Sequence, residues 1–145
     1  MAIVKYPPNT IWLGGGMVVV NDVAAGAAIT PGHLIERYNS SGTALYRKHS
    51  GAALSAVPIF ALNQSMLNKG VDDVYNTGDL VEAGIFQSGS LVWALIGVLT
   101  VVQGDRLESA GNGTLRILTA GFPIAVAAEG KVGASGETRV RVEIL

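Results

Sequence analysis

Closely spaced turn signals between residues 101 and 117 constrain the fold of this chain more than any other feature. The stretch reads VVQGDRLESAGNGTLRI: an apolar segment ends at Gly104-Asp105, and a second turn follows at Asn112-Gly113. Asn-Gly favours a tight hairpin because both residues tolerate a positive φ. Short apolar segments that end in such turns predict a β-ribbon.

The same order of turns and apolar segments occurs elsewhere in the chain. Residues 31–36 (PGHLIE) lead into residues 41–47 (SGTALYR), and residues 77–82 (TGDLVE) form a partial copy. The copies are short and degenerate, so they form a pseudo-repeat and not the fixed period of a solenoid. This pattern is more typical of a scaffold than of an enzyme.

The remaining apolar segments also have the length of strands. Residues 138–145 (TRVRVEIL) alternate, so Val140, Val142 and Ile144 are expected to face a core. Turn signals recur at the spacing of about 8–12 residues that is typical of all-β barrels and sandwiches. We therefore expect an all-β fold, a small barrel or sandwich.

Two further expectations concern the middle of the chain. Pro58 interrupts the Ala-rich stretch 51–67, because proline breaks a helix, so at most a short helical turn is expected near residues 64–67. The apolar segments 80–87 and 90–96 flank Ser88-Gly89 and predict a hairpin.

The N-terminus differs from the rest of the chain. Residues 1–15 are expected to form an extended arm and residues 16–145 the β-barrel domain. Pro7-Pro8 keeps the backbone extended, and three consecutive glycines from Gly14 provide a hinge. The alternative is that this segment is the first strand of the chain's own sheet and that Trp12 fills the core.

Composition excludes several classes of function. The chain has 145 residues, which suits one domain, and only 14% are charged, against a usual value of about 25%. Its net charge is −1 and it has no basic block, so nucleic acid is not an expected partner. The apolar run 91–102 is shorter than the roughly 20 residues of a membrane-spanning helix, so no membrane partner is expected. The low charge indicates a surface buried against partners, or one covered by small neutral residues.

No set of residues has the spacing of a catalytic or metal site. His33 and His49 have no second ligand at a suitable spacing, and Asp72-Asp73 lacks the alternation of a calcium loop. Ser88-Gly89-Ser90 does not complete a nucleophile elbow. Lys131 lies in a turn but lacks the flanking Met residues of a biotinyl or lipoyl carrier. We expect no enzyme activity, no metal and no cofactor.

Residues 62–79, LNQSMLNKGVDDVYNTGD, resemble a stretch of tailed-bacteriophage head decoration (capsid cement) proteins. There the pattern runs roughly L-x-x-x-x-x-G-K-G-I-D-D-x-Y-x-x-G-D, and Asn68 replaces its first Gly. The later segments 103–107, 112–115, 125–127 and 139–144 are similar to the second half of the same family. The likeness covers about residues 30–145 and leaves the arm unmatched.

This resemblance implies a fold, an assembly and a location. The fold is a small β-barrel or β-tulip of the kind found in the lambda head decoration protein. The assembly is a homotrimer at three-fold and quasi-three-fold positions of the expanded head, with the major capsid protein as partner. The location is the outer surface of the capsid in the virion, and no catalytic residue is implied.

On this expectation, the arm contacts the capsid or an adjacent decoration subunit. Tyr6, Ile11, Trp12 and Leu13 are the predicted contact residues, because a few buried anchors, aromatic ones above all, dominate interface energies. Deletion of residues 2–13 is expected to abolish capsid binding and to leave the barrel folded.

The alternative function is a head fibre or surface adhesin that binds host glycan. Exposed aromatic pairs on loops would favour it, whereas the chain offers only Tyr38, Tyr46 and Tyr75, scattered along the sequence.

Overall fold

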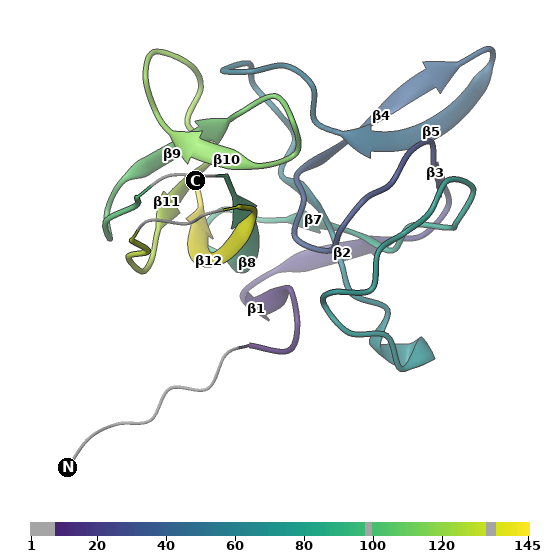
Figure 1. Cartoon of the computed structure of the whole chain (residues 1–145), viewed down its shortest axis with the longest axis horizontal. Helices are drawn as coiled ribbons and strands as arrows, with labels where there is room; N and C mark the ends of the chain where they lie inside the picture. The colour runs from purple at the N-terminus through teal and green to yellow at the C-terminus, as the bar shows by residue number, and fades with distance from the viewer. Residues whose placement is uncertain (1–7, 98–99, 133–135) are drawn as a thin grey trace.

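The structure, a computed structural model, describes residues 8–97, 100–132 and 136–145 (Figure 1). Strands dominate it, and its helical content among these residues is one 3₁₀ turn, η1 (Ser65–Leu67). The strands are β1 (Trp12–Gly14), β2 (Met17–Val20), β3 (Ala24–Ala25), β4 (Ile35–Ser40), β5 (Thr43–Lys48), β6 (Ile59–Ala61), β7 (Ala83–Phe86), β8 (Leu91–Ile96), β9 (Arg106–Ser109), β10 (Leu115–Ile117), β11 (Ala125–Ala127) and β12 (Thr138–Ile144). The all-β expectation and the short helical turn are both confirmed. No helix in the described ranges is long and apolar enough to cross a membrane.

Five strands close a small barrel in the order β8-β10-β9-β11-β12. The seam is the antiparallel pairing of β12 with β8, which runs from Thr138 opposite Ile96 to Glu143 opposite Leu91. The expected barrel is therefore confirmed, and it occupies the left side of Figure 1.

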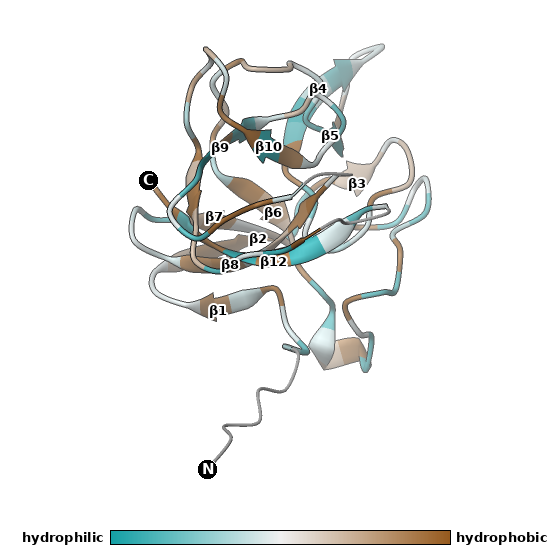
Figure 2. Ribbon diagram, turned by 60° about the vertical axis from the view of Figure 1, so that its left-hand side comes forward, coloured by the Kyte–Doolittle hydropathy of each residue, from teal (hydrophilic) through white to brown (hydrophobic). Residues whose placement is uncertain are grey.

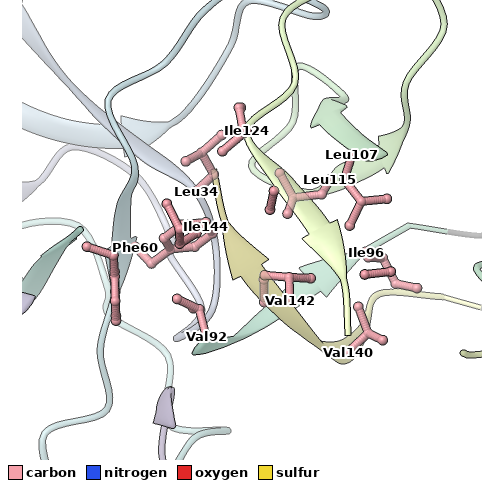
Figure 3. Packing of buried hydrophobic residues seen from close by; sticks show 14 of the residues in the cluster. Leu34, Phe60, Val92, Ile96, Leu107, Leu115, Ile124, Val140, Val142 and Ile144 are labelled. Atoms are coloured by element: carbon pink, nitrogen blue, oxygen red, sulfur yellow. The ribbon is translucent and has the colours of Figure 1, made fainter. Parts of the chain in front are cut away.

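The alternation of β12 explains how this barrel is filled. Val140, Val142 and Ile144 are at most 2% exposed and point into the barrel core (Figure 3). Leu107 and Leu115 meet them from β9 and β10. Each such side chain contributes about 2 kcal/mol of burial, so the alternating segment predicted from sequence is a main support of the barrel.

A second apolar cluster lies outside the barrel. The sheets β2-β7-β6 and β3-β5-β4 enclose it. Ile29, Ile35, Tyr46 and Tyr75 lie in it, each at most 3% exposed. The pattern of turns and apolar segments in the sequence does not predict this division into two cores.

Two of the three turns of the pseudo-repeat share one construction. Gly78 and Gly104 have φ values of 92° and 95°. The aspartate after each accepts a hydrogen bond from the backbone N–H three residues earlier: Asp79 from Asn76 and Asp105 from Val102, both at 2.8 Å. A Gly that reaches positive φ and an Asp that closes the turn give the Gly-Asp pair a physical role at both sites.

The first copy of the pseudo-repeat joins the two halves of the molecule. The Gly32 N–H donates to the Ala61 carbonyl of β6, and the Leu95 N–H of β8 donates to the Gly32 carbonyl. The Leu34 N–H reaches the Gly113 carbonyl in the β9–β10 turn. Residues 30–34, the junction segment hereafter, therefore hold the barrel against the second cluster.

The hairpin expected around Ser88-Gly89 is wrong. The turn forms, with the Ser90 N–H donating to the Gln87 carbonyl, but β7 pairs with β2 and β6, and β8 pairs with β1 and β12. A turn signal fixes a change of direction, whereas the pairing depends on which neighbour buries each strand. Here the chain passes from one sheet to another.

A buried carboxylate secures the loop after β10. Glu108 is 0% exposed, and its Oε1 accepts hydrogen bonds from the Thr119 N–H (2.9 Å) and hydroxyl (2.7 Å). These hydrogen bonds lower the pKa of Glu108, so the carboxylate stays charged beneath the loop.

Gly121 lies where this loop crosses Glu108. A methyl group there would overlap the carboxylate and the Ala53 carbonyl and would lie 2.6 Å from the Ala53 Cβ. We expect Gly121→Ala to lower the free energy of unfolding by about 2 kcal/mol, measured by denaturant titration. The control is Gly136→Ala, which meets nothing within 4 Å. Equal stability of the two variants would contradict the close packing of this loop.

Candidate interaction surface

β1 is an added strand at the rim of the barrel. Trp12 pairs with Val92 and Gly14 with Leu91, whereas β10 meets β8 only at Ile96. β1 therefore extends the barrel wall where β10 does not reach. The alternative that this segment belongs to the chain's own sheet holds for residues 12–14.

Ile11 is the residue of this segment that enters the core. Its side chain is 0% exposed, its N–H donates to Asn63 Oδ1 at 3.1 Å, and its carbonyl accepts from the Trp93 N–H at 2.8 Å. Ile11 therefore stabilises the chain's own fold and presents no side chain to a partner, contrary to the expectation for it.

Trp12 takes the opposite orientation. Its side chain is 46% exposed, and its indole Nε1–H donates to the Gly15 carbonyl at 3.2 Å. Leu13 is half-buried, and Tyr6 lies outside the described residues. Of the four predicted contact residues, Trp12 and Leu13 are the ones seen with accessible surface.

A hollow of about 210 Å³ lies next to Trp12. Met17, Val19 and Leu62 supply apolar walls, and the half-buried Glu82 adds a carboxylate. We call it the β1–β2 hollow. Sequence reasoning missed it because its walls come from three separate segments.

One side-chain set superficially resembles a hydrolase triad. Ser109 Oγ lies 2.7 Å from His49 Nδ1, and His49 Nε2 lies 3.7 Å from Glu36 Oε2. Ser109 and His49 are separated by 60 residues, so their sequence spacing gives no sign of the contact. Because Ser109 is 0% exposed, no substrate reaches its hydroxyl, and the set serves as a buried hydrogen-bond network.

Glu36 belongs to a second hollow, of about 360 Å³, beside this network. Burial opposes ionisation of Glu36, but hydrogen bonds from Ser50 and Arg47 outweigh it and lower the pKa of this carboxyl. Glu36 also forms an ion pair with Arg47 at 2.8 Å, so its carboxylate is engaged by residues of its own chain.

The other candidate residues are also engaged in structural contacts. Asp72 pairs with Arg139 at 2.8 Å, the Ser90 hydroxyl donates to the Gly16 carbonyl at 2.7 Å, and Lys131 bridges Val101 through its backbone. Across residues 8–97, 100–132 and 136–145, no group of three or more His, Cys, Asp or Glu side chains has the geometry to hold a metal.

His33 is a buried histidine at the centre of the junction segment. It is 1% exposed, its Nδ1 accepts the Thr30 N–H at 2.9 Å, and its Nε2 lies 3.0 Å from Glu137. Because Nδ1 is an acceptor, the ring is neutral and its proton lies on Nε2. Burial lowers the pKa of His33 and outweighs the opposing effect of Glu137.

This arrangement predicts a loss of stability in weak acid. Below the unfolded pKa of about 6.5, the unfolded chain binds a proton that the folded His33 ring does not bind. The free energy of unfolding therefore decreases as the pH is lowered, until the pH passes below the lower pKa of the folded state. We expect His33→Gln to remove this part of the slope between pH 7 and 5, measured by urea titrations at fixed pH. The same slope in both proteins would contradict the assignment.

No protein-family model matches this chain, and no curated protein does either.

Proposed function

We propose that this chain is a structural protein of a phage virion that decorates the outer surface of the head. In this proposal it binds the major capsid protein and stabilises the expanded lattice, as trimers at three-fold and quasi-three-fold positions. The likeness of residues 62–79 to head decoration proteins motivates the proposal.

One structural observation carries the proposal. A closed barrel holds β1 at its rim, where Trp12 is exposed and Leu13 is half-buried. A closed barrel with a short added strand at its rim suits a clamp that lies across other subunits, because a strand at a sheet edge adds main-chain hydrogen bonds to a neighbour without needing a pocket.

The region of the resemblance forms an ordered loop. The Tyr75 hydroxyl donates to the Leu62 carbonyl at 2.5 Å, and the Gly70 N–H donates to Asp73 Oδ2 at 2.6 Å. Arg139 anchors the same loop through Asp72. The residues that carry the likeness thus form one loop, which contains η1.

Binding to the assembled shell alone would stabilise it by mass action. A ligand at 100 times its dissociation constant contributes about 2.7 kcal/mol per site, and a head offers many sites. This is the physical meaning of a cement role.

The glycan-binding alternative is less well supported. Tyr46 and Tyr75 are at most 3% exposed, and Tyr38 lies against Arg47, with the guanidinium carbon 4.7 Å from the ring centroid. These tyrosines do not form the exposed aromatic platform that stacks against a sugar.

A sedimentation experiment tests the proposal. Purified protein should pellet with expanded heads that lack it and should not pellet with unexpanded heads. Deletion of residues 2–7, which keeps Ile11 and β1, should weaken pelleting and leave the unfolding transition unchanged. Failure of the full chain to bind expanded heads would overturn the proposal.

A further inference from the structure

The residues of η1 form an exposed apolar knob. Met66 is 92% exposed and Leu67 64%, and Asn68 ends the turn in the left-handed conformation, with φ of 55°. The exposed Lys69 follows directly. Met66, Leu67 and Lys69 are the knob hereafter, an apolar tip with one cation beside it.

The β1–β2 hollow lies beside the knob on the same side of the molecule. Ser65, the first residue of η1, is part of its lining. Figure 2 shows β1 and the short helical turn in the lower part of the view, each with hydrophobic residues. Trp12, Met17, Val19 and Leu62 line the hollow with apolar surface, and Glu82 adds a carboxylate.

The knob and the hollow are complementary in chemistry. An apolar tip matches apolar walls, and Lys69 matches Glu82. Neither of these two charged side chains forms an ion pair within the described part of the chain. A solvent-exposed Met-Leu pair favours association, because removing its apolar surface from water lowers the free energy.

We propose that the knob of one copy of this chain inserts into the β1–β2 hollow of a second copy. Met66 and Leu67 then pack against Trp12 and Val19 of the second copy, and Lys69 pairs with its Glu82. Each copy carries both halves of the contact, so copies arranged head to tail close a ring in which every knob lies in a neighbour's hollow. The evidence for this contact is the exposure and chemistry of the named residues. Only the number of copies, three, depends on the function proposed above.

The test is the mass of the full chain in solution, measured by light scattering and by sedimentation across a concentration series. The wild-type protein should exceed the 15.0 kDa of one chain and should dissociate on dilution. Met66→Asp should raise the dissociation constant at least tenfold. Val102→Asp is the matched control, because Val102 is 63% exposed and lies in the barrel turn before Asp105.

Charge reversal tests whether Lys69 of one copy pairs with Glu82 of the other. Lys69→Glu and Glu82→Lys should each weaken association about tenfold, and the double variant should restore it, because the pair is rebuilt with opposite signs. A structural role of either residue would not produce such rescue. Burial of Trp12 should also shift tryptophan emission to shorter wavelength as concentration rises.

Any of four results would overturn the proposal. The first three are a wild-type chain that stays monomeric throughout, equal effects of Met66→Asp and Val102→Asp, and a double charge variant no better than the singles. Loss of association on deletion of residues 2–7, with Met66→Asp unaffected, would also overturn it and assign the hollow to the N-terminal segment. None of these measurements uses phage heads, so failure here is distinct from failure of the head-binding proposal.

Discussion

Replacement of Arg139 by alanine is expected to lower the free energy of unfolding by about 3 kcal/mol. The Arg139 side chain is 10% exposed and links three segments. Its guanidinium donates to the Pro31 carbonyl at 3.1 and 3.2 Å and to the Val71 carbonyl, and it lies 5.4 Å from the centre of the Trp93 ring. Its loss leaves these two carbonyls without the guanidinium donors and frees both the junction segment and the loop after η1, which carries Val71 and Asp72.

Two controls separate the contribution of the Arg139 hydrogen bonds to stability from the contribution of its charge. Arg139→Lys keeps the charge but not the planar donors, so it should recover little stability. Asp72→Asn should cost less than about 0.5 kcal/mol, because Asp72 is 90% exposed and the pair is screened by water. If Arg139→Lys matched the wild-type protein in a denaturant titration, the hydrogen-bonding role of Arg139 would be refuted.

Replacement of Ile11 by alanine is expected to cost about 3 kcal/mol, because it leaves a cavity in the barrel core. Trp12→Ala should cost less than about 1 kcal/mol, since half of that side chain already meets solvent. Thermal unfolding of the two variants gives this comparison directly. The reverse order of destabilisation would mean that Trp12, and not Ile11, fills the core.

The position of Ile11 also changes what a deletion can show. Removal of residues 2–13 takes away Ile11 and most of β1, so it should destabilise the barrel together with any effect on binding. Lost head binding by that deletion would therefore not isolate an arm contact. The shorter deletion of residues 2–7 avoids this problem.

The sequence predicted those parts of the fold that depend on local pattern. Val140, Val142 and Ile144 alternate, and they face the core. Gly78-Asp79 and Gly104-Asp105 close turns with the same hydrogen bond, so the pseudo-repeat reflects real local structure.

The remaining features depend on contacts between distant residues. His33 and Glu137 are 104 positions apart, and Arg139 reaches Pro31 across 108, so no local pattern announces either contact. Ile11, Trp12 and Leu13 are all apolar, and only the pairing with β8 decides which of them is buried. Ser88-Gly89 forms the predicted turn, but the strands on either side of it, β7 and β8, pair with other strands and not with each other.

The most direct test of the proposed function is the number of copies in purified particles, counted by quantitative mass spectrometry against the major shell protein. A cement role predicts a large fixed ratio, near one copy per shell subunit. A few copies per particle would contradict a cement role and favour a fibre or vertex protein. Absence from particles would contradict a structural role in the virion altogether.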